Sequence, residues 1–189
     1  MGGAVVDTSS VTKAIAAGLA YVTEDRKQLG LVLDEPIVKN ITLANLAGVA
    51  TRGVLSRGRE QQVAEEYRRA MSIRTPSVFQ KVVNLSGGNQ QKVVLSKWLF
   101  ADPQVLILDE PTRGIDVGAK FEIYTIMNEL AAQGRGVVMV SSEMPELLGM
   151  CDRIYVMNEG RIVGELSRAE ATQERIMSMI LNDGKARVA

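Results

Sequence analysis

The sequence of 189 residues contains no histidine and only one cysteine, Cys151. The absence of histidine excludes histidine general bases, most zinc sites and the usual Ser–His nucleophilic pairs. A single cysteine cannot form an internal disulfide or a thiolate metal cluster, which is typical of a protein from a reducing cytoplasm. Chemistry in this chain must therefore rely on carboxylates, backbone amides and Mg²⁺.

The sequence also lacks an excess of charge and long apolar runs. It has 22 basic and 22 acidic residues and a formal net charge of zero, so no positive surplus can follow a nucleic acid backbone, and we expect no nucleic acid partner. The longest aliphatic runs, such as Val105–Leu108 and Val137–Val140, are far shorter than the roughly twenty residues of a membrane-spanning helix. The N-terminal stretch shows no basic-then-apolar pattern of a signal peptide.

Apolar segments alternate with amphipathic ones along the chain. We expect buried strands at 18–25, 104–108 and 136–142, then a hairpin that turns at Gly160 and a closing helix capped by Ser167. The other expected helices span 35–46, 56–71, 89–100 and 121–130. Ser86 is expected to cap the helix at 89–100, which buries Val93, Val94, Trp98 and Leu99. This order predicts an α/β fold with a mostly parallel sheet covered on both faces and a helical insert at 31–97.

The string VLILDEP at 105–111 places two acids directly after a buried strand. Ligands of open α/β sheets bind at the carboxyl ends of the strands, so Asp109 is suited to hold Mg²⁺ and Glu110 to orient and deprotonate an attacking water. Two acids alone would more often be solvated charge at a strand end. The four preceding aliphatic residues and the following Pro and Gly-rich turn favour the catalytic interpretation.

The string LSGGNQQK at 85–92 is more specific. A serine and two glycines at a helix start offer a hydroxyl, unobstructed N–H groups and the positive end of the helix dipole, which together suit the end of a triphosphate. A capped helix after a flexible loop is the alternative for the three residues alone. The whole octapeptide just before the acid-tipped strand favours an anion site.

These strings resemble motifs of the ATP-binding cassette (ABC) transporter ATPases. LSGGNQQK is similar to their signature motif, VLILDEP to their Walker B strand and TRGIDVGAK to their D-loop. The resemblance runs from about Gly18 to Ile180. The strings EDRKQLGLVL and VSSEMPELLGMCDRI further resemble the second cassette of bacterial monosaccharide importers of the xylose, galactose or multiple-sugar type, whose ATPases carry two cassettes in one chain.

The resemblance implies a partial P-loop NTPase fold in three parts. Residues 1–30 would form the core strand and Q-loop region, 31–97 the helical subdomain with the signature, and 98–189 the Walker B strand, D-loop, switch strand, hairpin and closing helix. It also implies site residues: for the nucleotide Ser86, Gly87, Gly88, Gln90 and Asp116; for Mg²⁺ Asp109 and Glu24; for hydrolysis Glu110 and, at the switch position, Ser142.

Three departures from the family pattern stand out. No Walker A string, G-x-x-x-x-G-K-[ST], occurs, and the nearest one, GVLSRGRE at 53–60, has lost the lysine and the Mg²⁺-binding hydroxyl, so we interpret it as a loop. We therefore expect the N-terminal strand and Walker A loop to be absent and the chain to be a C-terminal piece of a cassette. Glu24 occupies the position of the Q-loop glutamine, and Ser142 that of the switch histidine.

ABC cassettes pair head to tail, so the resemblance implies that Ser86–Gly88 serve ATP held by a companion cassette. We expect the chain to be a piece of the ATP-binding subunit of a sugar importer, inactive alone and dependent on ATP and Mg²⁺. The implied partners are the companion cassette, the permease and, indirectly, a periplasmic sugar-binding protein, at the cytoplasmic face of the bacterial inner membrane. A nucleoside- or autoinducer-type importer and a non-hydrolysing ABC-like interaction module remain alternatives, while an ABC protein of DNA repair or translation is disfavoured.

Overall fold

The computed structural model describes the backbone of residues 2–186 and the side chains of residues 2–181. Its contacts divide the chain into two compact units, with the division between Val140 and Ser141. The sequence did not predict this boundary. The expected three-part division at 30/31 and 97/98 stays a prediction.

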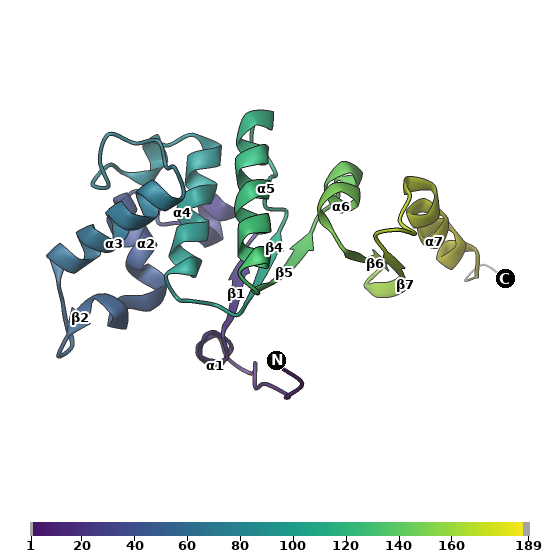
Figure 1. Cartoon of the computed structure of the whole chain (residues 1–189), viewed down its shortest axis with the longest axis horizontal. Helices are drawn as coiled ribbons and strands as arrows, with labels where there is room; N and C mark the ends of the chain where they lie inside the picture. Colours follow the sequence, from purple (N-terminus) through teal and green to yellow (C-terminus); the bar gives the residue numbers. More distant parts are fainter. Residues whose placement is uncertain (1, 187–189) are drawn as a thin grey trace. The chain divides into compact units, whose positions relative to one another are not determined.

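A parallel sheet forms the centre of the first unit (Figure 1). Its three strands, in the spatial order β1-β4-β5, are β1 (Leu19–Val22), β4 (Val105–Asp109) and β5 (Gly136–Val140). Leu19 pairs with Val105, and Val105 pairs with Gly136, so the carboxyl ends of all three strands lie at one edge. The predicted α/β fold with a parallel sheet is confirmed.

The sheet is not covered on both faces in the part of the chain that the structure describes. Leu106 and Leu108 are fully buried on one face, but Tyr21, Val138 and Val140 are 45%, 50% and 46% exposed on strands expected to be buried. Helix α4 packs against β1 and helix α5 against β5. The prediction that helices cover both faces of the sheet is therefore wrong for the face that bears Tyr21.

Helices dominate the region between β1 and β4, as predicted. Its helical elements are η1 (Arg26–Gly30, a π-helical turn), α2 (Ile37–Thr42), η2 (Leu43–Val49), α3 (Arg57–Ala70), η3 (Val82–Asn84) and α4 (Gly87–Leu99). A small hairpin, β2 (Ala50–Thr51) and β3 (Val54–Leu55), interrupts them. Residues 53–60, interpreted as a loop, instead form the hairpin turn, β3 and the first turn of α3, because Ser56 caps that helix.

Helix α5 (Val117–Ala132) begins four residues before the predicted start at Phe121 because Asp116 caps it. The predicted stripe on α4 is buried at Val93, Val94 and Leu99, whereas Trp98 is only half-buried. A short helix, α1 (Val11–Ala16), precedes β1.

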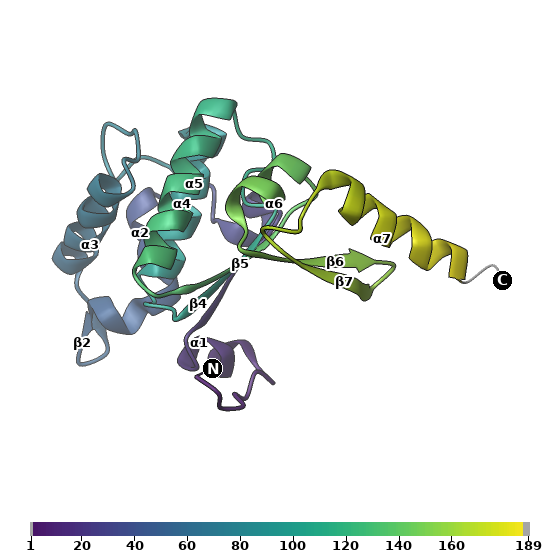
Figure 2. The ribbon, with the colours of Figure 1, turned by 45° about the vertical axis from the view of Figure 1, so that its right-hand side comes forward.

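The second unit is a hairpin with two helices. Its elements are α6 (Met144–Met150), β6 (Arg153–Asn158), β7 (Arg161–Ser167) and α7 (Gln173–Ala186). Figure 2 shows α7 lying along the hairpin, and Ile154, Val156, Leu166 and Ile176 form the core between them. Glu159 and Gly160 at the tip have φ of +46° and +77°, so the predicted turn at Gly160 is confirmed.

The prediction that Ser167 caps the closing helix is wrong. Ser167 ends strand β7, where it pairs with Arg153, and its hydroxyl donates to the Glu170 carboxylate at 2.6 Å. Helix α7 begins at Gln173, and the Thr172 hydroxyl accepts a hydrogen bond from the Arg175 N–H at 3.2 Å. Among the described residues, no helix combines the length and apolarity required to cross a membrane.

Candidate functional site

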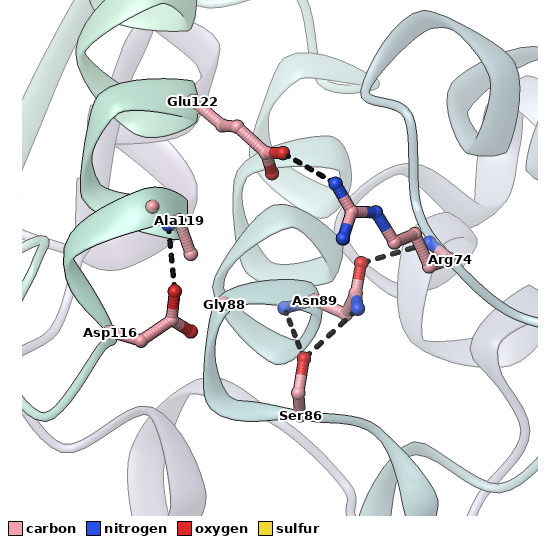
Figure 3. Close-up of a pocket in the computed structure, with 8 residues that line it drawn as sticks. Arg74, Ser86, Gly88, Asn89, Asp116, Ala119 and Glu122 are labelled. Atoms are coloured by element: carbon pink, nitrogen blue, oxygen red, sulfur yellow. Dashed lines mark hydrogen bonds and ion pairs between the residues drawn. The ribbon is translucent and has the colours of Figure 1, made fainter.

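Ser86 begins helix α4 with an extended backbone, and its Oγ accepts a hydrogen bond from the Asn89 N–H at 3.5 Å. The Asn89 side-chain amide donates a second bond to the same Oγ at 3.0 Å (Figure 3). The prediction that Ser86 caps this helix is confirmed. The positive end of the α4 dipole therefore lies at Ser86.

A second helix start lies beside the first. Helix α5 is capped by Asp116, whose Oδ1 accepts from the Ala119 N–H at 2.9 Å, and α4 and α5 stand side by side (Figure 1, Figure 2). A pocket of about 160 Å³ between their first turns is lined by Arg74, Ser86, Gly88, Asn89, Asp116, Gly118, Ala119 and Glu122 (Figure 3). Two helix N-termini thus border one small hollow: the start of α4 at Ser86 favours an anion, whereas the start of α5 carries the Asp116 carboxylate.

Gly88 allows the two helices to approach each other. A Cβ at this buried position would lie 2.6 Å from the Ala119 Cβ and 3.6 Å from the Ile115 Cγ2. No side chain fits at such distances unless the helices separate. The second glycine of the motif is therefore required for packing, in addition to any contact with a ligand.

Charged side chains bridge α4 and α5 at the far end of the pocket. The Lys92 ammonium, which is 2% exposed, donates to the Glu122 carboxylate at 2.6 Å. The exposed Arg74 donates to the other oxygen of Glu122 at 3.0 Å (Figure 3). The hydrogen bond from Lys92 is the main reason that the pKa of Glu122 is lowered. Sequence analysis missed Arg74 and Glu122 because they lie 48 residues apart, and no local pattern relates them.

The structure brings together three of the five residues predicted for the nucleotide: Ser86, Gly88 and Asp116. Gly87 lies next to the pocket, against Arg26. Gln90 is buried and does not line the pocket, and its Nε2 donates to the carbonyls of Val82 and Leu85 at 3.3 Å each. Gln90 thus supports the loop before α4, and its predicted role toward the nucleotide stays a prediction.

The predicted acids lie at the carboxyl end of β4. The Tyr21 hydroxyl donates to the Asp109 carboxylate at 2.6 Å from the neighbouring strand, and this hydrogen bond raises the pKa of Tyr21. Glu110 adopts a left-handed backbone with φ of +45°, and its N–H donates to the Val140 carbonyl at 2.9 Å. Tyr21 was missed because alternation along β1 indicates only which face it occupies, not its bond to Asp109.

Glu24 forms an ion pair with the Arg113 guanidinium. Among the described side chains, no group of three histidine, cysteine, aspartate or glutamate residues could hold a metal ion. Asp109 fits Mg²⁺ as a single oxygen ligand. The predicted roles of both acids toward Mg²⁺ stay predictions.

The predicted switch residue, Ser142, belongs to the second unit. Its neighbour Ser141 orders the loop: the Ser141 hydroxyl donates to the buried Glu146 carboxylate at 2.6 Å and accepts from the Glu143 N–H at 3.0 Å. The loop that carries Ser142 is thus held by a buried acid, a residue that sequence analysis did not single out.

The profile of the ABC transporter family matches residues 3–113. The chain belongs to this family. It is 63% identical over 178 residues to the L-arabinose transport ATP-binding protein AraG of Geobacillus stearothermophilus, covering 94% of this chain and 35% of that protein. It is 58% identical over 176 residues to the xylose import ATP-binding protein XylG of Geobacillus kaustophilus, covering 93% of this chain and 35% of that protein. The chain thus spans about a third of the length of these curated relatives.

Solved ATP-binding cassettes share the fold. One is a cassette dimer in a post-hydrolysis state with ADP and Pi, with a TM-score of 0.71 and 22% identity over 86% of this chain and 68% of that one. Another is a nucleotide-free cassette from an ABC transporter, with a TM-score of 0.66 and 18% identity over 91% of this chain and 68% of that one. The α/β architecture described above is therefore that of an ABC ATPase cassette, consistent with a partial P-loop NTPase fold.

Proposed function

We propose that this chain is part of the ATP-binding subunit of a bacterial ABC importer, peripheral to the cytoplasmic face of the inner membrane, that couples ATP hydrolysis to uptake of a monosaccharide. The pocket between the first turns of α4 and α5 carries the proposal, because it places Ser86 and Gly88 at a helix start suited to a phosphate. The similarity to arabinose and xylose import proteins supports a sugar over a nucleoside or autoinducer.

The signature acts, in this proposal, on ATP held by a companion cassette. Ser86 is exposed at the mouth of the pocket, so a phosphate carried by another chain or domain could reach it. The Asp116 carboxylate on the opposite wall would repel a phosphate and is better suited to accept a hydrogen bond from a hydroxyl or amide. The anion therefore takes the Ser86 side of the pocket.

The acids at the end of β4 belong to a second ATP site. Asp109 would hold Mg²⁺, which neutralises charge on the phosphates when bound. Tyr21, bonded to one oxygen of Asp109, orients that carboxylate, and Glu110 orients the attacking water and accepts its proton. Ser142, in the position of the switch histidine, can hydrogen-bond but carries no positive charge, so we expect it to support hydrolysis less well than a histidine would.

Ser86→Arg should lower the ATPase activity of the assembled importer by about tenfold or more, since the side chain would fill the phosphate side of the pocket; a factor of ten is about 1.4 kcal/mol of barrier. Glu110→Gln should have the smaller effect. The matched control is Ser56→Arg, because Ser56 caps α3 in the same way but lies outside the pocket.

The 189-residue chain alone, which has no Walker A string, should show no turnover and little thermal shift with millimolar ATP–Mg²⁺.

Loss of turnover in Glu110→Gln together with a harmless Ser86→Arg would refute signature donation as the main role. An importer insensitive to both substitutions would instead favour a non-hydrolysing interaction module.

A permease helix is the proposed partner of the segment after β1. Leu29 and Val32 are 72% and 47% exposed there. They lie close in sequence to a pocket of about 300 Å³ lined by Glu24, Asp25, Arg26, Lys27 and Arg113. Exposed apolar side chains beside a charged hollow suit an amphipathic helix.

Single cysteines at positions 29 and 32, in a Cys151→Ser background, should crosslink to the permease in the reconstituted importer. Cysteines at the equally exposed Met157 and Ile162 of the hairpin serve as controls. Crosslinking confined to the hairpin positions would contradict this docking site.

A further inference from the structure

One side chain connects three separate segments of the first unit. Arg26 begins the π-helical turn η1, and its guanidinium donates to the carbonyl oxygens of Arg113 at 2.9 Å and Gly114 at 3.5 Å. The same guanidinium Nη2 lies 2.9 Å from the point that a Cβ on Gly87 would occupy. The Q-loop region, the first turn of α4 and the turn before α5 therefore meet at one cation.

The neighbours of Arg26 hold it in this position. The Asp25 Oδ1 accepts hydrogen bonds from the N–H groups of Lys27 and Gln28 at 3.0 Å each, which fixes the start of η1. Glu24 forms an ion pair with the Arg113 side chain, while Arg26 binds the Arg113 carbonyl. Glu24 and Arg26 thus bind the side chain and the backbone of Arg113, respectively.

Burying the Arg26 guanidinium has an electrostatic cost. Burial lowers its pKa, with Asp25 acting in the opposite direction, and its Nε is buried without a hydrogen-bond partner. A buried unsatisfied donor on a long, flexible side chain requires an explanation. Two carbonyls of one tight turn match the planar fork of a guanidinium, which a lysine ammonium cannot reproduce.

We infer that Arg26 is a positioning residue: its hydrogen bonds hold the turn at Arg113 and Gly114, and its guanidinium packs against Gly87 in the first turn of α4. It thereby keeps Ser86 and Asp116, on the two walls of the pocket, at a fixed separation. The inference rests on the proposed function only in assuming that this pocket receives nucleotide. The link itself is a property of the fold and can be measured without activity.

Hydrogen exchange in the assembled importer tests the link. The amides of Gln90, Arg113 and Ile115 donate within the two segments that Arg26 joins, to the carbonyls of Ser86, Glu110 and Thr112. Arg26→Ala should accelerate their exchange about tenfold and leave strands β6 and β7 unchanged. Arg26→Lys should give an intermediate rate, and Lys27→Ala, which removes the adjacent cation, should leave exchange unaltered.

Gly87→Ala provides an independent test. Its Cβ would lie 2.9 Å from the Arg26 Nη2 and 3.2 Å from the Gly114 carbonyl oxygen, so the flexible guanidinium should be expelled. The variant should reproduce the exchange pattern of Arg26→Ala, and the double variant should exchange no faster than either single one. Gly58→Ala is the control, because a Cβ at that helical glycine meets nothing within 4 Å.

Two results would overturn the inference: unchanged exchange at both segments in Arg26→Ala, or equal acceleration throughout α3, which would indicate general loss of stability. The proposed function fails separately, when Ser86→Arg leaves ATPase activity intact. An Arg26 effect on exchange with a harmless Ser86→Arg would retain the positioning role and reject the nucleotide site. Unchanged exchange in Arg26→Ala together with loss of ATPase activity in Ser86→Arg would retain the nucleotide site and reject the positioning role.

Discussion

Gly88→Ala should destabilise the first unit by about 1–3 kcal/mol, the usual range for overpacking a tight core position. The new Cβ would lie 2.6 Å from the Ala119 Cβ and 3.9 Å from the Ala119 Cα, so α4 and α5 must separate along their first turns. Urea denaturation followed by the fluorescence of Trp98, the single tryptophan of the chain and a residue of α4, measures the loss of stability.

Ala119→Gly should restore part of the lost stability in the Gly88→Ala background, because it removes the opposing Cβ. On its own it should destabilise by up to about 1 kcal/mol, the usual difference in helix propensity. Gly58→Ala again serves as the control, with open space around it. If Gly88→Ala is no less stable than Gly58→Ala, the close approach of the two helices is not required.

Glu122→Gln should remove about 2 kcal/mol of stability at neutral pH. It leaves the buried Lys92 ammonium without a charged partner, facing only neutral acceptors: the Ser72 carbonyl at 3.1 Å and the new amide oxygen. The expected loss is below the roughly 3–5 kcal/mol typical of a fully buried pair because the Glu122 side chain is 38% exposed and solvent screens it.

Lys92→Met should destabilise the first unit less than Glu122→Gln does, since it removes the buried charge along with the ion pair. The variant with both substitutions should then be no less stable than Lys92→Met alone. Equal stability of Glu122→Gln and the unaltered chain at pH 7 would show that Lys92 needs no carboxylate partner.

The same ion pair predicts a pH dependence. The pKa of Glu122 is held below its ordinary value of 4.5, first by the hydrogen bond from Lys92. Its contribution to stability is therefore complete above the unfolded-state pKa and is lost as the pH falls through the lower folded-state pKa. The stability difference between Glu122→Gln and the unaltered chain should shrink below about pH 4.5. A difference independent of pH would contradict this assignment.

Local chemistry explains which parts of the fold could be predicted from the sequence. The Ser86 cap, the turn at Gly160 and the parallel order of β1 and β4 follow from residues close in sequence or from the alternation of strands and helices. Ser167 shows the limit of this approach. Both Ser167 and Thr172 are competent caps, and the pairing of Ser167 with Arg153 in the hairpin assigns the cap to Thr172.

The candidate site was less predictable because its contacts join distant segments. Arg26 meets the carbonyl of a residue 87 positions away, and Arg74 meets Glu122 across 48 positions. Gln90 lies two residues after the glycines of the motif, yet its side chain turns into the helical region and donates to the Val82 and Leu85 carbonyls. A motif identifies the segment that forms a site, whereas tertiary packing decides which of its side chains face the ligand.

The backbone of Glu110 has a consequence for how this chain can change. Its φ of +45° lies in the left-handed region, where a residue with a side chain is less stable than glycine by about 1 kcal/mol. Selection for stability alone would replace Glu110 with glycine and remove the carboxylate at the end of β4. Engineering this cassette for thermal tolerance would thus favour loss of the carboxylate to which we assign hydrolysis under the proposed function.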